Sequence, residues 1–180
     1  NMPSLRKASA YSKKLVRPFT RKSGNRKDAY IKAVPASKIV KFQMGNEKAH
    51  RLGKHKVELR LVCDENIQIR DTSIEAARLL LNKNLDLEVP GQYFLKVKIY
   101  PHHVLRENKT AAGAGADRLS SGMKHSFGIN IGRAAIVKKG NDILFVSAED
   151  ERVARIVRKA IGIIKSKLPC KTRIVTKEIK

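Results

Sequence analysis

The stretch from Tyr100 to Arg133, YPHHVLRENKTAAGAGADRLSSGMKHSFGINIGR, sets the organisation of this 180-residue sequence. It follows neither the two-residue period of a strand nor the 3.6-residue period of a buried helix. Residues 92–99 before it alternate like a strand, and residues 134–146 after it have the pattern of a hairpin. Long glycine-rich insertions between strands are usually functional or disordered. The insertion, residues 100–133, is therefore our candidate functional site.

The composition points to a polyanionic partner. Lysine and arginine number 39 against 16 aspartates and glutamates, so the formal net charge is +23. Such a surface repels itself unless phosphates neutralise it, which favours nucleic acid over an anionic membrane. No apolar run approaches the ~20 residues that span a bilayer, and no signal peptide opens the chain. We expect an intracellular, soluble protein that does not enter a membrane.

The charge excess is concentrated at the N-terminus. The first 56 residues hold 16 lysines and arginines against two acidic residues. We interpret residues 1–36 as a basic arm that becomes ordered on RNA, with Tyr11, Phe19 and Tyr30 available to stack on bases. A merely solvated tail is the alternative. The candidate RNA contacts of the arm are Arg6, Lys7, Lys13, Lys14, Arg17, Arg21, Lys22, Arg26 and Lys27.

Residues 37–180 have the pattern of one folded domain. Alternating apolar and polar residues predict short strands separated by turns. The sequence KKGND at 138–142 suits a tight reversal, so we predict a hairpin of 134–137 with 143–146. The other predicted strands are 38–42, 57–63, 66–70, 92–99 and 172–176, with a loop at 45–53.

Two segments have helical periodicity. The first, residues 73–84, follows the capping-box spacing of Thr72 and Glu75. The second follows the same spacing of Ser147 and Asp150, carries an apolar stripe from Val153 to Ile164 and stops at Pro169. Strands and helices do not alternate regularly enough for a doubly wound parallel sheet. We therefore predict a two-layer α+β domain.

Within the insertion, the small residues 111–116 offer backbone N–H groups that can approach phosphates. They are no dinucleotide fingerprint, because Arg118 stands at the third glycine position. The side chain of Asn108 could pair with a base edge or a backbone oxygen. The candidate contacts of the insertion are His103, Arg106, Asn108, Lys109, Gly113, Gly115, Arg118 and Lys124, and those on the flanking strands are Lys96, Lys98 and Arg133.

The insertion also holds groups from which a metal site or a general base could be built. They are His102, His103, His125 and Asp117. Consecutive residues of an extended segment point in opposite directions, and no His-x-x-x-His pair occurs, so we expect neither a metal nor another cofactor. A metal-dependent RNA-processing enzyme is the alternative that would use them. Cys63 and Cys170 lack zinc-site spacing, and we expect two reduced thiols.

Several motifs carry a family resemblance. They are VPASKI at 34–39, SIEAAR at 73–78, HHVLRENK at 102–109, GAGADRL at 113–119 followed by Gly122-Met123, and Phe127-Gly128. Together they resemble the archaeal and eukaryotic branch of the large-subunit ribosomal proteins called L-ten-e, or universal L-sixteen. The resemblance covers nearly the whole chain.

The resemblance implies a non-enzymatic constituent of the large ribosomal subunit, bound to cytoplasmic ribosomes. The implied partners are large-subunit rRNA of the 23S/28S type, the nearby A-site and P-site tRNAs, the 5S rRNA region and neighbouring ribosomal proteins. The implied position is near the A-site tRNA and the peptidyl transferase centre, with residues 103–122 as the tRNA-facing loop. The implied fold is a hammerhead-like α+β core with a barrel-like sheet and two helices. A free RNA-binding assembly factor is the remaining alternative.

Overall fold

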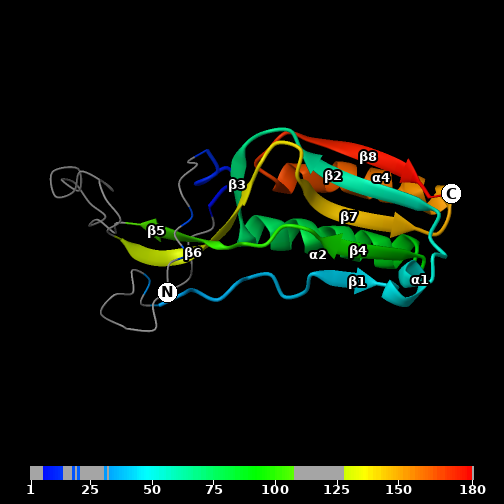
Figure 1. The fold of residues 1–180 in the computed structure, drawn as a ribbon, viewed down its shortest axis with the longest axis horizontal. Coiled ribbons are helices and arrows are strands. Elements are labelled where there is room, and N and C mark those ends of the chain that lie inside the picture. Colours follow the sequence, from blue (N-terminus) through cyan, green and yellow to red (C-terminus); the bar gives the residue numbers. More distant parts are fainter. Residues whose placement is uncertain are drawn as a thin grey trace.

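A computed structural model describes residues 6–13, 18, 20, 31, 33–107 and 128–179 of the chain. These residues form two antiparallel sheets and three α-helices, as Figure 1 shows. The predicted α+β class is confirmed. Within the described ranges both sheets are open, so the barrel-like sheet that the resemblance implied is not found.

The larger sheet has five strands in the order β1-β4-β7-β2-β8, and every neighbouring pair is antiparallel. Alternate side chains of each central strand, such as Leu59 and Leu61, are fully buried in one core. Burying a side chain of this size contributes ~1.5–3 kcal/mol, which is why the alternating pattern predicted these strands well. Their bounds are β1 Gln43–Gly45, β2 Val57–Cys63, β4 Tyr93–Val97, β7 Asp142–Ala148 and β8 Thr172–Glu178.

Two long helices, α2 (Asp71–Glu88) and α4 (Glu151–Ile164), cover one face of this sheet (Figure 1). A 3-10 turn, η1 (Lys165–Lys167), continues α4. The predicted apolar stripe of α4 is confirmed, because six residues of the helix are buried: Val153, Ala154, Val157, Ala160, Ile161 and Ile164. Within the described ranges, no helix packs across the centre of the opposite face of the sheet (Figure 1).

Both helices begin differently from the predicted capping boxes. The first residue of α2 is Asp71, whose carboxylate accepts hydrogen bonds from the N–H groups of Thr72 (2.8 Å) and Lys38 (3.0 Å). The N-cap residue of α4, Asp150, makes no side-chain capping bond. Ser147 lies three residues before Asp150, inside β7. The apolar periodicity located the helices, but the spacing of polar residues did not identify their caps.

The smaller sheet has the order β3-β6-β5 and extends from one end of the molecule (Figure 1). Its strands are β3 (Ile67–Arg70), β5 (His103–Glu107) and β6 (Ile129–Val137). Both described ends of the insertion are thus strands, contrary to our prediction. The alternation of apolar and polar residues did not predict β5, because His103, Val104 and Leu105 are all buried and burial does not alternate there.

The predicted hairpin of 134–137 with 143–146 is wrong. The reversal itself exists: the N–H of Asn141 donates to the carbonyl of Lys138, and Gly140 has φ +90°. However, β6 pairs with β3 and β5, whereas β7 pairs with β2 and β4. The turn therefore passes the chain from one sheet to the other. Turn chemistry specifies a change of direction, but not which strand becomes the partner.

The region before β2 also differs from the prediction. Residues 38–42 form no strand, although the carbonyl of Phe42 accepts a hydrogen bond from the N–H of Val97 (2.8 Å). The predicted loop contains a short helix, α1 (Glu47–Arg51), capped by the Asn46 side chain. Gly45 joins β1 to this helix with φ +84°, where a Cβ would collide with the Tyr93 carbonyl.

Candidate nucleic-acid interface

Many of the predicted RNA contacts lie outside the described residues. In the arm these are Lys14, Arg17, Arg21, Lys22, Arg26 and Lys27, and in the insertion they are Asn108, Lys109, Gly113, Gly115, Arg118 and Lys124. Asp117 and His125, on which the metal-dependent alternative relied, also lie outside.

The first described segment of the arm, residues 6–13, is docked on the smaller sheet. Arg70 on β3 donates to the carbonyls of Arg6 (2.8 Å) and Lys7 (2.7 Å). The N–H of Gln68 donates to the carbonyl of Ser12 (3.1 Å), and the Ser12 side chain is buried. These contacts attach the arm to the free edge of β3.

The arm also contacts the root of the insertion. The Arg6 guanidinium donates to both carboxylate oxygens of Glu107, the last residue of β5, at 2.7 and 3.1 Å. It also contacts the Tyr11 hydroxyl, and Tyr11 has a positive φ of 64°. Arg6, predicted to contact phosphate, thus has an internal ion pair, whereas Lys7 and Lys13 are exposed. We call this contact of segment 6–13 with β3 and Glu107 the arm latch.

At the start of β5 the two consecutive histidines point in opposite directions, as predicted. His102 is exposed, whereas His103 is only 3% exposed. Burial lowers the pKa of His103, and the nearby charges of Arg106 and His102 lower it further. His103 packs the root of the insertion, so its ring has almost no surface with which to contact tRNA directly.

Arg133, on β6, connects residues 33–35 to the smaller sheet. Its Nε donates to the carbonyl of Pro35 (2.7 Å), and its Nη1 donates to the Tyr100 hydroxyl (3.3 Å). Asn130 adds a bond from Nδ2 to the carbonyl of Ala33 (2.6 Å). Arg133 therefore has a structural role in addition to the RNA contact that we predicted for it.

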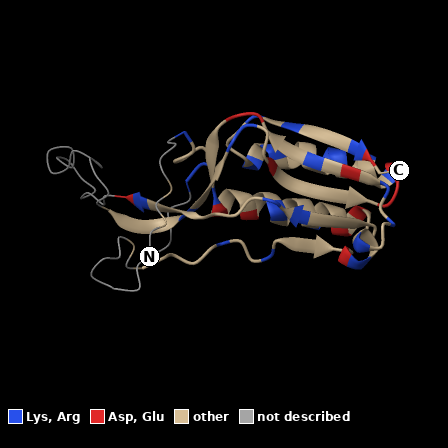
Figure 2. Ribbon diagram, in the orientation of Figure 1, with Lys and Arg blue, Asp and Glu red and all other residues tan. Residues whose placement is uncertain are grey.

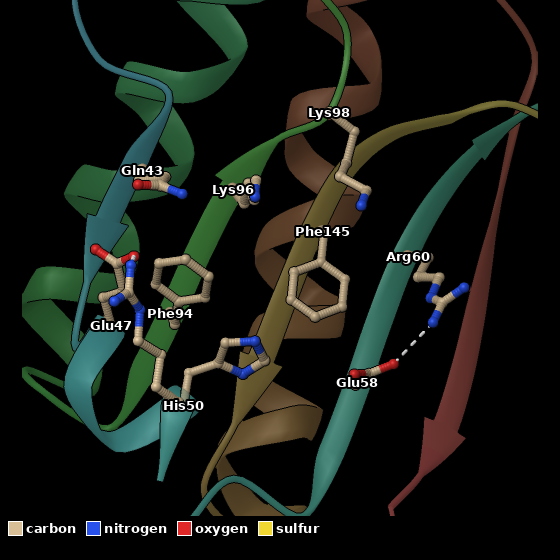
Figure 3. A pocket seen from close by; sticks show the side chains of 10 residues that line it. Gln43, Glu47, His50, Glu58, Arg60, Phe94, Lys96, Lys98 and Phe145 are labelled. Carbon is tan, nitrogen blue, oxygen red and sulfur yellow. Dashed lines mark hydrogen bonds and ion pairs between the residues drawn. The ribbon is translucent and has the colours of Figure 1, made fainter. Parts of the chain in front are cut away.

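Lys96 and Lys98 lie on the outer face of the larger sheet, opposite α2 and α4. They border a pocket of about 400 Å³, shown in Figure 3. Its other lining residues come from β1, α1, β2, β4 and β7: Gln43, Glu47, His50, Arg51, Glu58, Arg60, Phe94 and Phe145. The sequence did not predict this pocket. Alternation places each side chain on the outer face of its own strand, but only the strand order brings β4, β7 and β2 together.

Two histidines and a serine form a hydrogen-bonded network beside this pocket. The Ser147 hydroxyl lies 2.7 Å from Nδ1 of His55 and 3.0 Å from Nδ1 of His50. Ser147 and His55 are buried, and burial lowers the pKa of His55, as does the neighbouring His50. A fully buried hydroxyl cannot reach a substrate, so the network positions the His50 ring and performs no nucleophilic chemistry.

The described residues contain no cluster of three histidine, cysteine or acidic side chains that could hold a metal ion. Both cysteines are free, and burial together with the nearby Cys63 raises the pKa of the Cys170 thiol to about 12. Among the helices described, none is long and apolar enough to cross a membrane. Figure 2 shows lysines and arginines spread along the strands of the larger sheet.

A strongly basic α+β chain with a basic arm beside a basic insertion is typical of proteins that bind RNA as structural components. A family model described as "Ribosomal protein L16p/L10e" matches residues 17–175. This chain belongs to that ribosomal protein family. The resemblance drawn from the motifs is therefore confirmed, and the protein is a ribosomal protein and not an enzyme.

Archaeal relatives match along almost the entire chain, each bearing the name "Large ribosomal subunit protein uL16". The protein of Staphylothermus marinus is 45% identical over 177 residues, covering 98% of this chain and 95% of the relative. That of Methanoculleus marisnigri is 45% identical and covers 90% and 92%. That of Archaeoglobus fulgidus is 40% identical and covers 96% and 94%.

Proposed function

We propose that this protein is a constituent of the large ribosomal subunit, bound to cytoplasmic ribosomes through large-subunit rRNA and neighbouring ribosomal proteins. The observation that carries the proposal is the 45% identity to a large-subunit protein over 98% of the chain. The net charge of +23 agrees with it, because phosphates are the partner that neutralises such a surface.

The proposed position is near the A-site tRNA and the peptidyl transferase centre, with residues 103–122 facing the tRNAs. Two observations support an exposed, functional insertion. The register pairs Arg106 with Asn130 and Glu107 with Ile129, so the strands around the insertion end side by side at the tip of the smaller sheet. The arm latch holds residues 6–13 of the arm beside Glu107, at the same tip.

Salt-washed large subunits provide the first test. We expect the protein in a one-to-one ratio with another ribosomal protein after washing at high salt. Release by the wash, or presence only on immature particles, would instead identify a free assembly factor.

Chemical probing of rRNA tests the proposed position. Subunits with and without the protein are compared, and we expect nucleotides around the A site and the peptidyl transferase centre to be protected when it is present. The 5S rRNA region is probed in the same experiment. Protection confined to other regions would contradict the position while leaving subunit membership intact.

A further inference from the structure

We infer that the outer face of the larger sheet is a second RNA site, separate from the arm and the insertion, that binds an unpaired nucleotide. The base would lie against the rings of His50 and Phe145, and its phosphates against Lys96 and Lys98. The inference rests on the proposed function only in taking RNA as the partner.

The strand register brings the side chains of this site together. On the outer face, Lys96 of β4 is opposite Phe145 of β7, and Phe145 is in turn opposite Arg60 of β2. Directly opposed residues have Cβ atoms ~4.5–5.5 Å apart, so these three side chains form one row across the sheet. An aromatic ring thus lies between two cations at the centre of the sheet. Aromatic side chains within a basic groove are what proteins use to bind single-stranded nucleic acid.

The aromatic surface continues to the next row. The ring of Phe94 stacks on His50 with centroids 4.8 Å apart, and His50 meets the Phe145 ring edge-on at 5.6 Å. The helix α1 thereby forms one wall of the pocket, and Phe145, which is 8% exposed, lies at its floor. The volume of about 400 Å³ falls within the ~300–1,000 Å³ typical of small-ligand sites.

The charges around the pocket leave two lysines for a ligand. Arg60 is paired with Glu58 at 2.9 Å, and Arg51 is paired with Glu47 at 2.6 Å. In the described part of the chain, no carboxylate lies within 4.0 Å of the ammonium groups of Lys96 or Lys98. The ammonium of Lys98 lies 5.8 Å from the centre of the Phe145 ring. The unpaired charges of Lys96 and Lys98 therefore lie next to the aromatic rings. This arrangement suits a nucleotide, because its base can stack on the rings while its phosphates contact the lysines.

Ser147 is a positioning residue for this site. Its hydroxyl bonds Nδ1 of His50 and is itself held by buried His55, so the His50 ring is fixed over Phe94. Because Nδ1 is occupied, Nε2 is the nitrogen left to bond a base edge. An acidic peptide could satisfy the lysines, but it would use neither the aromatic stack nor this ring nitrogen. These features favour RNA over protein.

Magnetic resonance of the full-length protein tests the inference at the site itself. The ring signals of Phe145 and His50 are followed during titration with a single-stranded uridine hexanucleotide, an RNA duplex of equal length, and an acidic peptide of equal charge. We expect saturable shifts with the single strand and much smaller shifts with the other two. Equal shifts with the duplex would overturn the unpaired-base claim, and larger shifts with the peptide would show a protein-docking surface.

Variants identify the groups responsible. We expect Phe145→Leu, or Lys96→Gln with Lys98→Gln, to weaken the binding measured at the His50 signals by about five-fold or more, as for one lost stacked base. The matched control is Lys138→Gln with Lys139→Gln, which removes the same charge from the exposed turn before β7. Unchanged amide spectra confirm folding. A loss equal to that of the control would overturn the site.

The outcomes also separate this inference from the proposed function. If the protein binds large-subunit rRNA while the Phe145 and His50 signals do not move, the sheet site is wrong and subunit membership stands. If the protein binds no rRNA and is absent from washed subunits, the proposed function fails.

Discussion

Arg78 is a buried charge whose neutralisation depends on one neighbour. It is 6% exposed, and its Nε and Nη2 donate to Glu75 at 2.8 and 2.5 Å, while its Nη1 contacts the Met44 sulfur at 3.0 Å. Hydrogen bonding from Arg78 lowers the pKa of Glu75, so the pair remains charged at neutral pH. Buried pairs add little net stability, but breaking one leaves an uncompensated charge.

We therefore expect Glu75→Ala to lower the free energy of unfolding by about 3 kcal/mol at pH 7, measured by urea denaturation. Adding Arg78→Met should restore most of that loss, because it removes the stranded charge. A loss below about 1 kcal/mol in the single variant would mean that Arg78 reaches water when Glu75 is absent.

The buried histidines predict a pH dependence. Burial lowers the pKa of His55 and of His103 in the folded protein. As the pH falls below the unfolded value of ~6.5, the unfolded chain takes up protons that the folded chain does not. Their contribution to stability is thus fully present above pH ~6.5 and is lost as the pH falls toward the lowered folded values.

We expect the free energy of unfolding to decrease between pH 7.5 and pH 5.5, and His55→Gln with His103→Gln to flatten that decrease. The exposed His102→Gln is the control and should leave it unchanged. Imidazole resonances give a check that does not depend on the variants folding. Midpoints of His55 and His103 at or above the unfolded value of ~6.5 would contradict the prediction.

At the scale of the element, the arm latch joins segments about 100 residues apart in sequence. The side chains of Arg6 and Glu107 are 38% and 29% exposed, so their pair should contribute less than ~1 kcal/mol. We expect Glu107→Ala to leave the melting temperature almost unchanged but to speed amide exchange at Gln68, whose N–H bonds the Ser12 carbonyl. Exposed Glu178→Ala is the control. Equal exchange at Gln68 in both variants would show that the latch holds without this pair.

The insertion should tolerate shortening without loss of the core. Its described ends are register partners, so the hairpin already brings them together, and loop length then changes stability only slowly. We expect deletion of residues 108–116 to leave the melting temperature nearly unchanged and to impair translation by subunits that carry it. Normal translation would show that these residues are dispensable, and a large drop in melting temperature would show that they pack on the core.

The helices and strands also differ in how well the sequence alone predicted them. The helix α4 and the strands β2 and β4 were predictable because one face of each is apolar and buried, whereas the other face carries polar side chains such as Arg60 and Lys96 that are only partly buried. The strand β5 was not, because His103, Val104 and Leu105 are all buried and show no alternation, and the first half of β6 was not, because none of residues 129–133 is buried. The candidate site also has a part that the sequence predicted and a part that it did not. Lys96 and Lys98 were found by charge, whereas the pocket beside them required the pairing of β4 with β7.

At the scale of the whole molecule, the basic arm should dominate the salt dependence of RNA binding. Each phosphate neutralised contributes ~0.7–0.9 to the log-log slope. We expect a variant with glutamine at seven basic positions of the arm to lose up to roughly 6 units of this slope in rRNA binding. The seven positions are Lys13, Lys14, Arg17, Arg21, Lys22, Arg26 and Lys27. Arg6 is retained so that the arm latch remains. An unchanged slope would show that the arm is a solvated tail.

The open edges of the larger sheet have a consequence for the chain before it meets RNA. An exposed edge strand can pair with another copy and start aggregation. One edge here, β1, is only three residues long. The other, β8, exposes Arg173, Lys177 and Glu178 along its length. The short length of β1 and the charged side chains along β8 therefore disfavour pairing of two newly made copies edge to edge.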